Sequence, residues 1–128
     1  MNILCLHGCR QTKEMFKQLL KVFTVKSEHT FFFIDGMYDH SQQGKMWYKR
    51  ELRLDEIGVT VYDPGMTMKT IYQINESITE NKIDMLIGFS QGANVIDTYL
   101  QITHDERIKR AILISGYSFM GVPRTCLT

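Results

Sequence analysis

The sequence has few cysteines, no long apolar run and no signal peptide, and each of these absences argues against a class of protein. Its three cysteines, Cys5, Cys9 and Cys126, are an odd number with no Cys-x-x-Cys spacing. This argues against a disulfide framework and against a zinc site, and it favours reduced thiols in the cytoplasm. No apolar run approaches the roughly 18 residues that cross a bilayer, and the N-terminus lacks the basic head of a signal peptide. We therefore expect a cytoplasmic protein that does not associate with membranes.

An excess of charge of either sign is also lacking. Fifteen basic and fourteen acidic residues leave a net charge of +1, which gives no long-range attraction for nucleic acid. The basic pairs Lys49–Arg50 and Lys109–Arg110 are typical of solvated element ends, so we expect no nucleic-acid partner. A length of 128 residues with 44% hydrophobic residues predicts one domain, residues 1–128, with an ordinary core.

Apolar runs alternate with helical spacings along the chain. Helices are predicted by apolar residues three and four positions apart, as at Met15, Phe16, Leu19, Leu20 and Phe23, and again at Ile71, Ile74 and Ile78. Strands are predicted at 2–6, 31–34, 83–89 and 110–117, and the unbroken run 31–34 favours a strand buried on both faces. Residues 36–65 are polar and irregular, which predicts a long functional loop. The alternation indicates an α/β fold, a parallel sheet with helices on both faces.

The segment LIGFSQGANVI, residues 86–96, places a Gly-x-Ser-x-Gly turn between a predicted strand and a predicted helix. Gly88 and Gly92 remove the side chains that would collide around a strained turn, and Ser90 is thereby exposed as a nucleophile. The alternative is a tight strand-to-helix turn without chemistry.

Two backbone amides are expected to stabilise an oxyanion beside this serine. The helix that starts at Gln91 directs free amides and its positive dipole end towards Ser90. The second donor is expected from the amide of Cys9, because the loop after the first strand lies at the same end of a parallel sheet. The Cys9 thiol itself is expected to be buried and inert.

The segments LCLHGCRQT, FFFID, IDMLIGFSQGA and AILISGYS occur in an order that resembles the FSH-type serine hydrolase family, over residues 2 to about 118. The resemblance implies the N-terminal part of an α/β-hydrolase fold, with four strands in the spatial order second, first, third, fourth. It implies Ser90 as the nucleophile of a carboxylic-ester hydrolase, and the amides of Gln91 and Cys9 as its oxyanion hole. It also implies a small ester or acyl ligand, lined by the loop from Tyr38 to Trp47, and no cofactor or metal.

Members of this family continue beyond the strand that matches AILISGY. They add two further strands, an aspartate turn and a histidine near the C-terminus, which these 128 residues do not match. We therefore expect a truncated member in which Ser90 is retained, the triad Asp and His are absent, and esterase activity is weak or missing. One alternative is a non-catalytic pseudohydrolase that binds a ligand or a protein. Another is a site completed by a histidine of a second chain.

The four histidines differ in their expected position. Sites in parallel α/β sheets lie at the carboxyl ends of the strands, which excludes His29 and His104 because both precede strands. His7 follows the first strand, and the resemblance implies that it belongs to the loop that shapes the oxyanion hole. With Tyr38 and Trp47, we expect it to line the pocket in a structural role. His40, beside Asp39, is the candidate for a surrogate base.

The last predicted strand is expected at the edge of the sheet. Its apolar residues and unpaired backbone would then form a template for another strand. We expect a homodimer through Ala111 to Ser115.

Overall fold

Four parallel strands form the central sheet of the computed structural model, which describes residues 1–51, 61–62 and 64–115. The strands are β1 (Asn2–Leu6), β2 (Thr30–Ile34), β7 (Met85–Phe89) and β8 (Arg110–Ile114). Their order in space is β2-β1-β7-β8, and all three pairings are parallel. The predicted order, second, first, third, fourth, is confirmed. The last part of the strand predicted at 110–117 lies outside the described residues.

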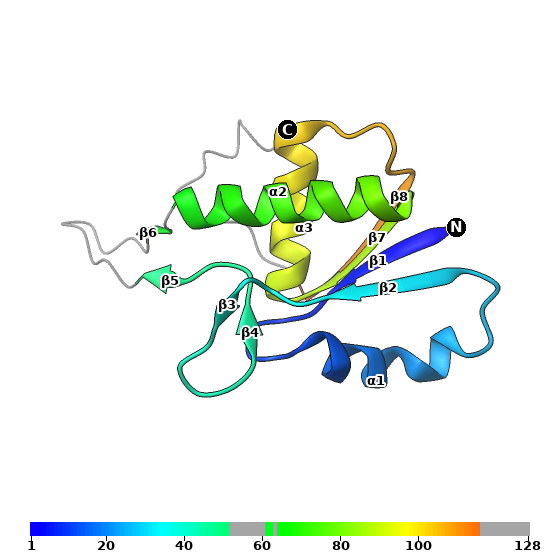
Figure 1. Cartoon of the computed structure of the whole chain (residues 1–128), viewed down its shortest axis with the longest axis horizontal. Helices are drawn as coiled ribbons and strands as arrows, with labels where there is room; N and C mark the ends of the chain where they lie inside the picture. Colours follow the sequence, from blue (N-terminus) through cyan, green and yellow to red (C-terminus); the bar gives the residue numbers. More distant parts are fainter. Residues whose placement is uncertain (52–60, 63, 116–128) are drawn as a thin grey trace.

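Three helices cover the two faces of this sheet. They are α1 (Lys13–Thr24), α2 (Pro64–Asn81) and α3 (Gln91–Thr103). Helix α1 lies on one face, whereas α2 and α3 lie together on the other (Figure 1). The three layers of the predicted α/β fold are thus present. In the part of the chain that the structure describes, no helix is long and apolar enough to span a membrane.

The larger core lies between the sheet and the pair α2 and α3. Its buried side chains include Leu4, Leu6, Ile71, Ile74, Ile78, Leu86, Val95, Ile96 and Tyr99. The stripe that the spacing in α2 predicts is therefore buried as expected. Trp47 and Tyr48 enter the same core from the segment between β2 and α2, which fixes that segment against the start of α3.

The apolar stripe of α1 is buried only in part. Phe16 is buried between the helix and the sheet, close to Phe33 of β2. The side chains of Met15, Leu19 and Phe23 remain 44–71% exposed. The helix was predicted, but its periodicity could not reveal that α1 contacts mainly β1 and β2. On this face, α1 reaches β7 through Phe16, which stacks on Phe89, and no described helix covers β8 (Figure 1).

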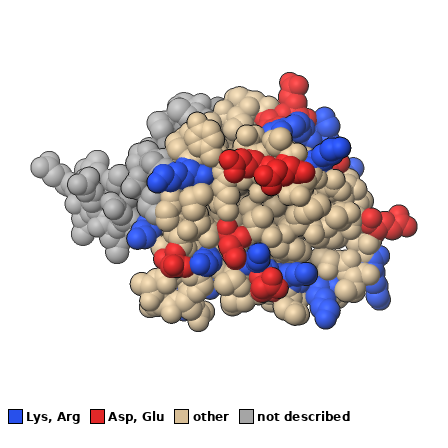
Figure 2. Space-filling model, in the orientation of Figure 1, with Lys and Arg blue, Asp and Glu red and all other residues tan. Residues whose placement is uncertain are grey.

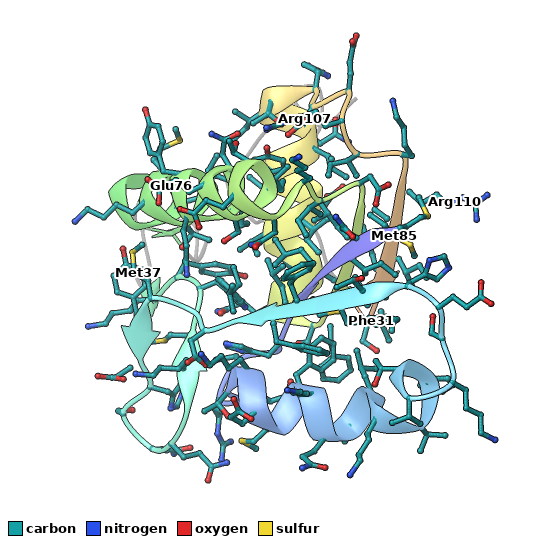
Figure 3. The ribbon with its side chains drawn as sticks, turned by 45° about the vertical axis from the view of Figure 1, so that its right-hand side comes forward. Phe31, Met37, Glu76, Met85, Arg107 and Arg110 are labelled. Carbon is teal, nitrogen blue, oxygen red and sulfur yellow. The ribbon has the colours of Figure 1, made fainter. Side chains whose placement is uncertain are left out.

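The strands β2 and β8 are the two edges of the described sheet. The unbroken run 31–34 predicted a strand buried on both faces, and its side chains do pack against both cores, Phe32 and Ile34 against one and Phe31 and Phe33 against the other. They are only half-buried, because β2 is an edge strand that pairs with β1 alone. Phe31 is labelled in Figure 3, at the edge of the sheet above α1. All five residues of β8 are exposed, and β8 pairs only with β7, so the prediction of an edge strand is confirmed.

The segment 36–65, expected to be irregular, contains short antiparallel pairs. These are β3 (Tyr38–Asp39) with β4 (Lys45–Met46), and β5 (Arg50–Glu51) with β6 (Val61–Tyr62). Strands of two residues are too short to show an alternation in the sequence. Helix α2 begins at Pro64, within the expected loop, because proline suits the first helical position.

The end of the sheet opposite the serine turn is held by a polar network around Arg107, which is labelled in Figure 3 near the end of α3. The Arg107 guanidinium donates to Asp105, Asn75 and Thr79 at 2.8–3.0 Å. Through these bonds, it ties α2 to the loop between α3 and β8. Hydrogen bonding to Arg107 lowers the pKa of Asp105 to about 2.

Charged side chains of both signs are mixed over the molecular face in Figure 2. That face shows no large patch of one charge, in agreement with the balanced composition. The described residues contain no group of three or more His, Cys, Asp or Glu side chains that could hold a metal ion.

Candidate active site

Ser90 occupies the turn between β7 and α3 in a strained backbone conformation. Its φ is 53° and its ψ is −113°, values that residues with a side chain rarely adopt. Such a conformation costs on the order of 1–3 kcal/mol and persists only where the surroundings enforce it. The Ser90 N–H donates to Ile114 O at 2.8 Å, and the Ser90 carbonyl accepts from Asn94 N at 3.1 Å. The serine is therefore fixed by β8 on one side and by the first turn of α3 on the other.

The two glycines of the motif make this turn sterically possible. A Cβ on Gly92 would lie 2.2 Å from Leu6 O and 2.6 Å from His7 O. A Cβ on Gly88 would lie 2.7 Å from the backbone N of Ala93. Both positions are backbone collisions that no side-chain rotation can relieve. The prediction that Gly88 and Gly92 avoid steric collisions in this turn is therefore confirmed.

The loop after β1 leaves one amide available for a ligand. In this loop, Gly8 N donates to the Gln11 side chain at 2.7 Å, Gln11 N to Gly8 O at 3.2 Å, and Arg10 N to Lys45 O at 2.9 Å. Among the described residues, no group accepts from the amide of Cys9. The structure therefore keeps the Cys9 amide free, where the sequence predicts an oxyanion donor.

The second predicted donor is the amide of Gln91, the first residue of α3. The first amides of a helix have no acceptor within the helix and carry its positive dipole end. Gln91 and Cys9 both line one cavity, so the two amides belong to the same part of the molecule.

The side chain of Gln91 has a role that the sequence did not reveal. Its Oε1 accepts from Trp47 N at 2.6 Å, and its Nε2 donates to Tyr48 O at 3.1 Å. The Tyr48 hydroxyl accepts from the Asn94 side chain at 3.3 Å. Buried hydrogen bonds thus hold the segment Trp47–Tyr48 on the first turn of α3. Thr70 of α2 adds a further bond, donating its hydroxyl proton to Trp47 O.

His7 is fully buried, and both of its ring nitrogens are engaged. Its Nδ1 donates to Gly8 O at 2.7 Å, and its Nε2 accepts from Gly36 N at 2.9 Å. Trp47 packs against the ring at 4.9 Å, and its Nε1 donates to His7 O at 2.8 Å. Burial lowers the pKa of His7, so the ring is neutral. His7 therefore fixes the loop after β1 and has no free nitrogen with which to take a proton from Ser90.

The other three histidines also lack the position or the free lone pair of a base. His40 Nδ1 accepts from Gln42 N at 3.0 Å, so the neutral ring carries its proton on Nε2. His29 bonds the amino group of Met1 at 2.8 Å, and His104 caps the C-terminus of α3. Both of the latter lie at the end of the sheet away from Ser90, as expected from the sequence.

A cavity of about 550 Å³ opens beside the oxyanion donors. Its lining consists of Cys9, Asp39, His40, Ser41, Met46, Tyr48, Lys49 and Gln91. The predicted pocket loop supplies four of these residues, from Asp39 to Met46. His7, Tyr38 and Trp47, which were expected in the pocket, are not among its lining residues, and Trp47 is fully buried.

The two thiols in the described chain differ in burial. Cys5 is buried in β1, and burial raises its pKa to about 12. Cys9 is half-buried, and burial likewise raises the pKa of its thiol. A raised pKa keeps a thiol protonated and poorly nucleophilic, which agrees with the expectation of an inert Cys9. Cys126 lies outside the described residues.

Gln11 is the site residue that the sequence argument passed over. It belongs to the motif HGCRQ, and its side chain occupies the Gly8 amide while its carbonyl accepts from Lys45 N at 2.9 Å. Its presence in a recognisable motif was a signal that could have pointed to it. Its bond to Gly8 lies within the loop, whereas its bond to Lys45 comes from a hairpin distant in the sequence.

The site therefore combines three features. Ser90 lies in a strained turn at the N-terminus of α3, and the loop after β1 leaves the amide of Cys9 free. Such donors stabilise the negative oxygen that develops when a serine attacks a carbonyl. A base for the serine proton is not found among the four histidines.

Comparisons with known proteins agree with this geometry. The family model described as serine hydrolase (FSH1) matches residues 1–124. Among solved structures, a carboxylesterase from Mesorhizobium loti aligns with a TM-score of 0.69 and 16% identity, over 94% of this chain and 56% of the other. Esterase PE8 aligns with a TM-score of 0.66 and 18% identity, over 91% and 58%. A variant of Arabidopsis thaliana SOBER1 gives a TM-score of 0.66 and 14% identity, over 91% and 62%.

These identities are low, so the solved structures establish the fold alone. The chain spans a little more than half the length of each of them. A comparison with curated protein sequences gave no match. The family model, in contrast, matches almost the whole chain, including the loop after β1 and the turn around Ser90. The chain belongs to the FSH1 serine hydrolase family.

Proposed function

We propose that the chain carries the nucleophile and the oxyanion hole of a carboxylic-ester hydrolase. Ser90 Oγ attacks the ester carbonyl, and the amides of Cys9 and Gln91 hold the resulting oxyanion. The observation that supports this most strongly is the combination of a strained Ser90 with the free amide of Cys9. The fold shared with two esterases supports the ester class as the substrate.

Turnover by these 128 residues alone is expected to be weak or absent. A serine hydroxyl needs a base to take its proton, and removing a triad member lowers turnover by on the order of 10⁴ to 10⁶. His7 has no free nitrogen, and His40 would first have to release the Gln42 amide and move its own proton. What remains is stabilisation by the oxyanion hole and by substrate binding.

The test is reaction with a fluorophosphonate, which phosphonylates an activated serine. Ser90 Oγ forms a bond to phosphorus, fluoride leaves, and the serine proton passes to water. We expect slow labelling of the wild type and none of Ser90→Ala, while Ser77→Ala on α2 labels like the wild type. Hydrolysis of p-nitrophenyl butyrate should stay within about tenfold of the Ser90→Ala variant. Rapid hydrolysis that is lost in His40→Ala would instead identify His40 as the base.

A second candidate function is a binding module without catalysis. The observation that favours it is the engagement of both nitrogens of His7 and of Nδ1 of His40. This role predicts that Ser90→Ala binds an acyl ligand as tightly as the wild type. If a folded wild type never reacts with the fluorophosphonate, the binding module is the better description.

A further inference from the structure

The cavity beside Cys9 and Gln91 has a mixed lining, in which apolar and polar surface are about equal. Met46 and Tyr48 line it and are themselves almost completely buried. The lining side chains that are more open to solvent are Asp39, His40, Ser41 and Lys49. A pocket for a long alkyl chain is lined mainly by apolar groups. At about 550 Å³, this cavity has the volume of a ligand site, and charged and polar side chains supply about half of its lining.

The charges of the lining do not cancel. Asp39 pairs with Lys45 at 2.5 Å across the β3–β4 hairpin, which neutralises its carboxylate. Among the described residues, no acidic group pairs with Lys49. His40 adds a donor, because its Nδ1 accepts from Gln42 and its proton is therefore on Nε2. The lining thus offers one ammonium and one imidazole N–H, both of which suit a negatively charged oxygen.

The backbone that carries these donors is held in place from two sides. Lys49 directly follows Tyr48, whose carbonyl and hydroxyl bond the side chains of Gln91 and Asn94 on α3. The hairpin that carries His40 is bonded to the loop after β1 through Lys45. In Figure 1, the hairpin and the start of α3 lie at the same end of the sheet. The cavity therefore has a defined position relative to Gln91, the residue that follows Ser90, although Ser90 is not among its lining residues.

We propose that this cavity binds a carboxylate on the substrate, so that the preferred substrates are esters that carry a carboxylate on the arm next to the scissile carbonyl. A single ammonium, that of Lys49, which pairs with no acidic group among the described residues, matches a monoanionic carboxylate better than a dianionic phosphate. Lys49 is the specificity residue, with His40 as a second donor. This inference rests on the proposed function for its scissile bond, but the carboxylate site itself does not depend on the reactivity of Ser90.

Two fluorophosphonates of equal chain length test the inference, one ending in a carboxylate and the other in its methyl ester. We expect the carboxylate probe to label wild-type Ser90 roughly five to ten times faster at low salt, an effect typical of one charge-assisted contact. Lys49→Met should reduce this ratio to about one. Lys17→Met, on the exposed side of α1, should leave the ratio unchanged. Equal rates for the two probes in the wild type, or a ratio that survives in Lys49→Met, would overturn the inference.

A direct titration with glutarate separates this inference from the proposed function. NMR of the ¹⁵N-labelled protein should show saturable shifts of the amides around Lys49, and the affinity should fall several-fold in Lys49→Met and not in Lys17→Met. If neither probe labels Ser90 but glutarate binds in this way, the carboxylate site stands and the hydrolase proposal fails. If glutarate gives no saturable shifts in the wild type, the inference fails, whatever the labelling shows.

Discussion

The side-chain amide of Gln91 accepts a hydrogen bond from the backbone N–H of Trp47 at 2.6 Å and returns one to the next carbonyl, that of Tyr48. The residue that follows Ser90 is thus assigned two functions. We propose its backbone amide as an oxyanion donor, and its side chain joins α3 to a segment 44 positions away in the sequence. A change at Gln91 is therefore expected to affect both the placement of the segment Trp47–Tyr48 and the reactivity of Ser90.

Replacing Gln91 by methionine should therefore damage both stability and reactivity. The variant keeps the size of the side chain but leaves the Trp47 amide and the Tyr48 carbonyl buried without partners. We expect the free energy of unfolding to fall by about 2 kcal/mol, measured by urea denaturation. Labelling of Ser90 should slow at least several-fold. Gln18→Met, on the exposed side of α1, is the matched control, and equal losses in both variants would contradict this account.

Ser90→Gly should not destabilise the protein, because glycine tolerates the positive φ that serine adopts here only under strain. The relief, on the order of 1 kcal/mol, offsets the greater entropy of glycine in the unfolded chain. In contrast, Ser77→Gly places a glycine inside α2 and should cost about 0.5–1 kcal/mol. Thermal unfolding of both variants tests the comparison. A loss in Ser90→Gly as large as that in Ser77→Gly would mean that the turn is not strained.

The buried His7 should make the protein less stable in weak acid. Burial lowers its pKa in the folded state below the ordinary value of 6.5. As the pH falls below about 6.5, the unfolded chain takes up a proton at His7 that the folded chain does not, so stability decreases. Urea denaturation between about pH 7.5 and pH 5 should show this decrease. An NMR titration that places the His7 pKa at or above 6.5 would refute the assignment of a neutral, buried ring.

The exposed edge strand β8 should promote self-association. Ile112, Leu113 and Ile114 are 40–46% exposed, and β8 has a strand partner on one side only among the described residues. We expect concentration-dependent dimers through Ala111 to Ser115, measured by sedimentation velocity at micromolar concentrations. Ile112→Lys should shift the equilibrium to monomers, since a charge on an edge opposes pairing. Ile102→Lys, near the end of α3, is the control. A wild type that stays monomeric at high concentration would rule out this interface.

The elbow was predictable because its information is local. Gly88, Ser90 and Gly92 lie within five residues, and the strand before them and the helix after them follow from apolar patterns. The strand order was available from the alternation of elements and the resemblance of the motifs.

Other features depend on contacts that the sequence does not display. The bonds of Gln91 to Trp47 and of Lys45 to Gln11 require a loop and a hairpin to be placed first. The spacing in α1 identifies an apolar face but not what covers it, and Phe23 is in fact exposed. The strands β3 and β4 pair two residues each, which is too short for any periodicity.

A crystal structure of the protein after reaction with a small fluorophosphonate tests most directly whether Ser90 is the nucleophile and whether the amides of Cys9 and Gln91 hold the oxyanion. We expect phosphorus bonded to Ser90 Oγ, with the phosphonyl oxygen about 2.7–3.1 Å from the amide nitrogens of both Cys9 and Gln91. A phosphonyl oxygen directed away from these two amides, an adduct on another residue, or no adduct after prolonged exposure would contradict this expectation.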